Sequence, residues 1–158
     1  MPEPDRPRLP AGYGEFDPFT IESAPSWDDI ERRLESARNY WVTTSDDLGP
    51  HSVPVWGLWF DLAFMFATDR NSRKAKALAA DARCQFHLES GDDVVIVHGR
   101  SEPLAPDTLE RFVSSYLAKY GVQIDPDDAS HAFIRIVPTF ALTWIEEDFQ
   151  RSAARWTF

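Results

Sequence analysis

The most informative segment of the sequence is Thr68-Asp69-Arg70-Asn71-Ser72-Arg73-Lys74-Ala75-Lys76. It stands where an apolar, strand-like run (62–68) gives way to a short segment (72–80) rich in Ala and Lys, residues with good helix propensity. Four of the chain's 16 basic residues fall within its last seven positions, although the chain has 26 acidic residues and a formal net charge of -10. Such a basic cluster at the start of a helix in an acidic protein suggests a binding site for an anion.

The first turn of a helix suits an anion because its N–H groups are unpaired and the helix dipole leaves a partial positive charge there. Ser72 adds a hydroxyl donor, Arg73 a bidentate guanidinium and Lys74 a compact positive charge. These residues predict a phosphate cradle, and the alternative is an ordinary solvated helix face. The sequence contains no Walker A loop and no Gly-x-Gly-x-x-Gly after a strand, so the nucleotide-binding motifs do not account for the cluster.

The segments on either side predict short strands with a few helices between them. Helices are predicted at 27–37, where Ser26 is a plausible N-cap, at 72–80, and at 106–120, which starts at Pro106 and ends before Gly121. Alternating or continuous apolar runs predict strands at 39–44, 51–60, 62–68, 82–88, 94–100, 132–137 and 139–146. Strands that do not alternate regularly with helices favour an antiparallel barrel with peripheral helices over a doubly wound parallel sheet.

The predicted strand 51–60 is apolar on both faces. Val53, Val55 and Trp59 would lie on one face, and Pro54, Trp56, Leu58 and Phe60 on the other. A strand of a lone antiparallel sheet usually has one solvated face. We therefore expect a ligand, a helix or a partner subunit to cover the second face of this strand.

Composition excludes several classes of function. The acidic net charge argues against a general nucleic-acid binder and against binding to an anionic membrane surface. The sequence has no apolar run long enough to span a membrane and no signal-peptide pattern near its start, which predicts a cytoplasmic protein.

Cys84 is the only cysteine, so we expect neither an intramolecular disulfide nor a cysteine-based zinc site, and we interpret it as a small buried residue. The four histidines lack metal-binding spacing.

Two regions are predicted along the 158 residues. Residues 1–25 contain six prolines and little periodicity, which predicts an extended or partly disordered N-terminal arm. Residues 26–158 are enough for one domain with its own core. We find no internal repeat.

Four segments resemble one family. Thr68 to Arg83 is similar to the segment "T…S-R-K-x-x-N-L-x-x-D-P-R" of pyridoxamine 5′-phosphate oxidase-like proteins. Gly49-Pro50-His51-Ser52-Val53-Pro54-Val55-Trp56 resembles the "G-x-P-H-x-V-P-V-W" strand of that family, and Val97 to Pro103 its "V-x-G-x-A" strand. Arg155-Trp156 is similar to a C-terminal Arg-Trp of some members. The resemblance covers about residues 38–158 and departs from the family at Ala77 and Ala82, where Asn and Pro are usual.

The resemblance implies a mainly β (β+α) fold, a six-stranded antiparallel split β-barrel that forms a homodimer with its cofactor at the subunit interface. It implies that the strand bearing Val53, Pro54, Val55 and Trp56 borders the flavin or deazaflavin ring. The cofactor phosphate would lie at Thr68, Ser72, Arg73 and Lys74, and we add Asn71 of the same turn. Arg155 and Trp156 complete the candidate set, and we expect Trp156 to reach across the dimer.

The function that follows is an FMN-dependent oxidoreductase in which the cofactor carries the hydride chemistry. Coenzyme F-420 is the alternative cofactor, because the basic cluster could begin a groove for its anionic tail, although the acidic chain would oppose that tail. A non-catalytic module that binds flavin, haem or a tetrapyrrole is the alternative function. The substrate is not predicted. Oxidation of pyridoxamine phosphate itself is not expected, because the sequence shows no second basic cluster to hold a substrate phosphate.

Overall fold

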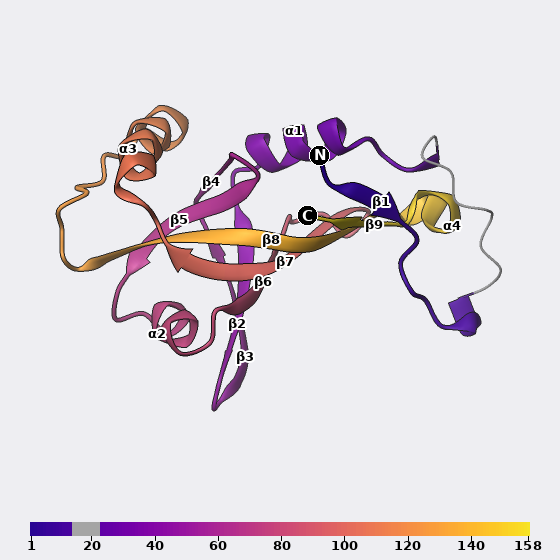
Figure 1. Ribbon diagram of the computed structural model, residues 1–158, viewed down its shortest axis with the longest axis horizontal. Coiled ribbons are helices and arrows are strands. Elements are labelled where there is room, and N and C mark those ends of the chain that lie inside the picture. Colours follow the sequence, from indigo (N-terminus) through magenta and orange to yellow (C-terminus); the bar gives the residue numbers. More distant parts are fainter. Residues whose placement is uncertain (14–22) are drawn as a thin grey trace.

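The computed structural model describes residues 1–13 and 23–158, and within them the strands join into one antiparallel sheet (Figure 1). The strands are β1 (Glu3–Asp5), β2 (Tyr40–Asp46), β3 (Gly49–Val55), β4 (Leu58–Phe60), β5 (Ala63–Asp69), β6 (Arg83–His87), β7 (Asp93–Pro103), β8 (His131–Ile145) and β9 (Ala154–Thr157). The α-helices are α1 (Trp27–Ser36), α2 (Arg73–Ala80), α3 (Pro106–Tyr120) and α4 (Phe149–Ser152), with short 3₁₀ turns η1 (Ala11–Tyr13) and η3 (Glu146–Asp148).

Strand β8 organises the sheet because two different strands share one of its edges. Its first half pairs with β5 and its second half with β9, while β7 runs along its other edge. From β7 the ladder continues through β6 and β2 to β3. Among the described residues no ladder joins β3 to β5, so the barrel formed by β2, β3, β5, β6, β7 and β8 is split there. The predicted mainly β, antiparallel split barrel with peripheral helices is confirmed.

The helices begin and end where their capping residues predict. The Ser26 side chain accepts from the backbone N–H of Asp29 at 3.1 Å, and Ser72 caps α2 in the same way. Helix α3 has Pro106 in its first turn and ends at Gly121, whose φ of 70° suits glycine. In Figure 1, α2 and α3 lie at one end of the molecule and α4 at the other.

The predicted strands 132–137 and 139–146 form a single strand in the structure. The predicted break at Pro138 does not occur, and β8 is one strand. The register of β7 against β8 shifts between His98 and Gly99, opposite Pro138. Thr139 is the residue that this bulge leaves out of the ladder, and a proline beside a bulge is tolerated without its N–H.

The predicted strand 51–60 is instead two strands, β3 and β4, separated by Trp56 and Gly57. Gly57 is required by close packing: a Cβ there would lie 2.4 Å from Phe64 Cε2 and 2.5 Å from the carbonyl oxygen of Met65. The chain therefore turns at Gly57 against β5, and Trp56 lies at the corner.

Two apolar clusters hold the fold together. The larger fills the barrel and is closed by α1; its fully buried members include Ile30, Tyr40, Val42, Phe64, Phe66, Phe86, Val97 and Ile136. The smaller lies under α3 and includes Phe112, Tyr116 and Met65. Helix α3 therefore packs Phe112 and Tyr116 against β4 and β5.

The described start of the N-terminal arm contains one strand, β1, and the short 3₁₀ turn η1. Residues 3–5 form β1 and pair with β9, so the start of the chain adds an edge strand to the sheet. The remainder of the predicted arm includes residues 14–22, which lie outside the described residues. No helix in the described parts of the chain is long and apolar enough to cross a membrane.

Candidate functional site

A cavity of about 330 Å³ opens where the barrel is split. Its walls come from the β3–β4 corner, the end of β5, the start of α2 and the buried side of α3. The lining residues are Asn39, Pro54, Val55, Trp56, Ala67, Thr68, Lys74 and Tyr116. The structure thus brings together five of the residues predicted from sequence, although Pro54 to Trp56 and Lys74 come from different elements.

Lys74 is the positive charge of this cavity. It projects from the first turn of α2, and within the described residues it makes no hydrogen bond and no ion pair. Partial burial lowers the pKa of its ammonium group, an effect that the nearby Asp69 carboxylate opposes. A partly desolvated ammonium without a partner is favourably placed to bind an anion.

Two hydroxyl groups lie beside the start of α2. The Oγ1 of Thr68, at the end of β5, is 3.3 Å from the Oγ of Ser72. The Ser72 hydroxyl accepts from the backbone N–H of Ala75 and so caps the helix. The other N–H groups of the first turn have no acceptor within the helix, so hydroxyls, amides and Lys74 together form a donor-rich corner.

Arg73 lies on the other side of α2 and does not line the cavity. Its Nε and Nη2 donate to the two oxygens of Asp46 at 2.7 Å each, and Nη2 also donates to the carbonyl of Gly49 at 3.2 Å. This bidentate contact raises the pKa of Arg73 and lowers the pKa of Asp46 to about 2. Arg73 therefore ties α2 to the β2–β3 turn, and its planar donor face is already occupied.

The basic cluster found in the sequence is dispersed in the structure. Arg70 donates to the carbonyls of Ala129 and His131. Asn71 and Lys76 line a separate hollow beside Arg73, together with Asp46 and others. Of the four basic residues, only Lys74 lines the cavity at the barrel split.

The Trp56 ring is held rigidly at the corner of the cavity. It stacks on Tyr120 with ring centroids 4.8 Å apart and planes inclined by 3°, and the guanidinium of Arg38 lies 4.9 Å from its centroid. The Tyr120 hydroxyl also binds Gly57, accepting from its N–H at 3.0 Å. Helix α3 thus fixes one aromatic wall of the cavity.

The C-terminal pair lies elsewhere. Trp156 is 4% exposed, packs against Trp27 and donates from Nε1 to Thr143 at 2.9 Å. The expectation that Trp156 reaches across a dimer is therefore wrong for its side chain, because its contacts lie in the core of its own chain. Arg155 lies on the outer face of the sheet, with its guanidinium carbon 3.8 Å from the Phe140 centroid.

Val53 and Cys84, which the sequence also singled out, do not line the cavity. Val53 pairs with Val42 in the ladder. Burial raises the pKa of Cys84 to about 12, as fits its interpretation as a packed residue. Sequence reasoning missed Asn39, Ala67 and Tyr116. Tyr116 recurs at helical spacing with Leu109, Phe112 and Tyr120, and such a pattern does not distinguish a core residue from a cavity wall.

Comparison with known proteins now identifies the family. The sequence profile of the family described as pyridoxamine 5'-phosphate oxidase matches residues 26–145. The chain belongs to the pyridoxamine 5'-phosphate oxidase family. No functionally curated protein matches the sequence.

Solved structures support the same fold. A putative pyridoxamine 5'-phosphate oxidase from Listeria innocua has a TM-score of 0.62 at 16% identity, covering 73% of this chain and 95% of that one. An F420 reductase has a TM-score of 0.58 at 20% identity, with 70% and 94% covered. The haem-storage protein HutZ from Vibrio cholerae has a TM-score of 0.60 at 12% identity, with 70% and 88% covered. At these identities the likeness shows the fold alone.

Proposed function

We propose that this member of the pyridoxamine 5'-phosphate oxidase family is an FMN-dependent oxidoreductase acting on a small organic substrate. The observation that carries the proposal is Lys74, a partly buried ammonium without a partner among the described residues, in a cavity with aromatic walls. The donors around it fit a phosphate, and the corner at Trp56 fits the edge of a flat ring. FMN, when bound, supplies the hydride chemistry.

The residues of the chain would bind and orient the cofactor. Lys74 and the hydroxyls of Thr68 and Ser72 would hold the phosphate, and Pro54, Val55 and Trp56 would border the ring. Arg73 would act indirectly, by holding the start of α2 against Asp46. Because α3 covers one side of the cavity with Tyr116, it would also exclude water from the ring.

FMN is favoured over coenzyme F-420 by the directions of the basic side chains. A long anionic tail needs a continuous basic groove, whereas Arg70 and Arg73 bind protein oxygens and Asp46 borders the hollow lined by Lys76. The donors at the cavity are enough to bind one phosphate-sized group. Lys74 is the one base among the residues that line the cavity, so pyridoxamine phosphate would find no second phosphate site there.

We further propose that the protein works as a homodimer. The outer face of the sheet carries partly exposed apolar and aromatic residues on several strands, among them Trp41 on β2, Ile96 on β7 and Phe140 on β8. His98 stacks on Phe140 with centroids 4.3 Å apart. A second copy of the chain would cover this face and could present its Arg155 to the cofactor.

The test is a titration with FMN followed by visible absorbance, using wild type and Lys74→Gln. We expect Lys74→Gln to weaken FMN binding about 10- to 100-fold, because a hydrogen bond to a charged group contributes about 1.5–3 kcal/mol. Riboflavin, which lacks the phosphate, should bind both proteins equally. Lys76→Gln is the matched control on the same helix and should bind FMN as wild type does.

Equal losses for FMN and riboflavin, or equal effects of the two lysine variants, would overturn the phosphate assignment. A parallel titration with coenzyme F-420 decides between the cofactors by the tighter ligand. Saturable binding without turnover of any reductant would instead favour the non-catalytic module.

A further inference from the structure

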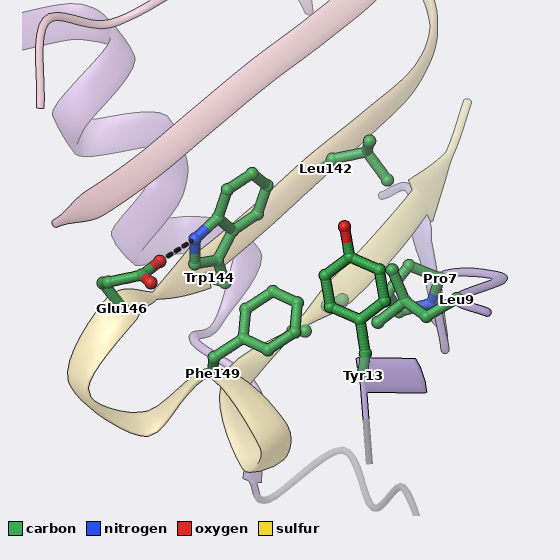
Figure 2. A pocket seen from close by; sticks show the side chains of 9 residues that line it. Pro7, Leu9, Tyr13, Leu142, Trp144, Glu146 and Phe149 are labelled. Carbon is green, nitrogen blue, oxygen red and sulfur yellow. Dashed lines mark hydrogen bonds between the residues drawn. The ribbon is translucent and has the colours of Figure 1, made fainter. Parts of the chain in front are cut away.

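A second cavity lies at the other end of the molecule. It has a volume of about 390 Å³ and is enclosed by the N-terminal arm, the end of β8 and α4 (Figure 2). It shares no lining residue with the cavity at the barrel split. In Figure 1, α4 lies at the end of the molecule opposite to α2 and α3.

Three aromatic rings from three separate elements surround this second cavity. Tyr13 comes from η1, Trp144 from β8 and Phe149 from α4. The ring centroids of Trp144 and Phe149 are 5.8 Å apart with planes at 89°, and those of Tyr13 and Phe149 are 6.3 Å apart. Figure 2 shows the three rings around a common space, with Leu142 at its far side.

Glu146 supplies the one charge among the residues that line this cavity. Its Oε2 accepts from the indole N–H of Trp144 at 2.9 Å, which fixes the carboxylate beside the rings. A carboxylate has several further acceptor positions. Of the basic residues nearby in sequence, Arg6 donates to the carbonyl of Gln150 and Arg151 pairs with Asp148, and neither is among the residues that line the cavity.

Three aromatic rings beside one carboxylate favour a positively charged ligand. The faces of aromatic rings attract cations, most strongly when the cation is weakly hydrated, and a carboxylate adds direct charge attraction. The residues that line the cavity include no base, so an anion in it would be repelled by Glu146, and a neutral apolar molecule would leave that carboxylate unused. We propose that this second cavity is a binding site for an organic ammonium ion, independent of the flavin site.

The experiment uses choline as the probe and its neutral isostere, 3,3-dimethyl-1-butanol, as the comparison. The indole N–H resonance of Trp144, identified by its loss in Trp144→Phe, reports on the site because that group is bonded to Glu146. We expect choline to shift this resonance saturably, and the isostere to bind about tenfold more weakly, in line with the strength of a desolvated cation–π contact.

Two carboxylate variants test the charge. Glu146→Gln should weaken choline binding about three- to fivefold, the effect of losing one partly exposed ion pair. Glu147→Gln is the matched control in the same turn, because Glu147 does not line the cavity, and it should bind choline as wild type does. Equal binding of choline and its isostere, no saturable shift, or equal effects of the two variants would overturn the proposal. Lys74→Gln should leave choline binding unchanged. The proposals for the flavin site and for this second cavity are therefore tested independently.

Discussion

At the scale of single residues, Gly57 sets the distance between the β3–β4 corner and strand β5. The backbone of Met65 and the ring of Phe64 leave no room for a Cβ. Both the N–H and the carbonyl of Gly57 are bound by the Tyr120 hydroxyl, which lies 2.8 Å from the carbonyl oxygen. One small residue therefore fixes where Trp56 stands relative to the cavity.

We predict that Gly57→Ala destabilises the protein by about 1–3 kcal/mol, because overpacking against a backbone oxygen forces the chain to move. The same variant should weaken FMN binding, since Trp56 must shift. Gly91→Ala is the control, as nothing lies within 4 Å of a Cβ there. Urea unfolding midpoints measure both, and a Gly57→Ala midpoint equal to that of Gly91→Ala would contradict the close-packing argument.

The contact of Arg73 with Asp46 predicts a pH dependence. The Arg73 side chain lowers the pKa of Asp46 from its ordinary value of 3.8 to about 2. Between these values the unfolded chain binds more protons at this carboxyl than the folded chain does, so stability falls as the pH drops. The contribution is fully present above about pH 4 and is lost as the pH falls through about 2.

Denaturant midpoints between pH 6 and pH 2 should therefore fall less steeply for Asp46→Asn than for wild type. Asp47→Asn, in the adjacent position of the turn, should keep the wild-type slope. Some acid sensitivity will persist in Asp46→Asn, because Arg83 lowers the pKa of Asp81 in the same way. Parallel slopes for wild type and Asp46→Asn would show that the ion pair does not stabilise the folded state.

At the scale of elements, local chemistry predicted the helices better than the strands. Helix α3 was predicted with its observed bounds because Pro106 and Gly121 mark both ends. Strand boundaries depended on contacts remote in sequence. Pro138 was predicted to break a strand, but Gly99 on β7 lets the chains approach at a bulge, and a Cβ at Gly99 would lie 2.4 Å from the Val137 carbonyl. The sequence of β8 alone does not predict this pairing, because it depends on a glycine of β7.

The β4–β5 hairpin contains a strained turn. Asp61 and Leu62 have φ values of 51° and 52°, a conformation that glycine and asparagine adopt more readily. Asp61 is bound by Arg111 of α3 at 2.7 Å. Leu62 is 40% exposed, so little packing compensates for its backbone strain.

We predict that Leu62→Gly stabilises the protein by about 0.5–1 kcal/mol. Relief of a left-handed conformation is worth roughly 1–2 kcal/mol, and the greater freedom of glycine in the unfolded chain offsets part of it. Thermal unfolding measures the change, with Leu48→Gly, an exposed residue without positive φ, as the comparison. Destabilisation by Leu62→Gly similar to that of Leu48→Gly would mean that Leu62 makes compensating contacts.

At the scale of the whole molecule, the site could be predicted only in part. Ser72 and Lys74 were predicted from a helix cap and a basic residue in one first turn, whereas Thr68 was added only by the family resemblance. Sequence alone could not show that Arg73 turns to Asp46, because that contact joins α2 to a distant hairpin. Nor could it separate Trp56 in the cavity from Trp156 in the core.

The centre of the outer face of the sheet is apolar and only partly buried. Ile96, His98 and Phe140 lie on it between strands whose alternate residues, such as Val97 and Ala141, are fully buried. The described helices leave this central region uncovered, since α1 and α3 pack on β4, α2 on β2 and α4 on the end of β8. An apolar sheet face of this kind is an expected interface between copies of a chain.

Sedimentation velocity should show dimers of the wild-type protein at micromolar concentration. Phe140→Lys should shift it toward monomers, because a second copy would have to bury the new ammonium group beside Arg155. Leu117→Lys, on the exposed side of α3, should remain dimeric. If the cofactor lies at the interface, Phe140→Lys will also lose FMN while its circular dichroism stays native. A folded monomeric variant that binds FMN with wild-type affinity would place the whole site within one chain and leave no role for the partner's Arg155.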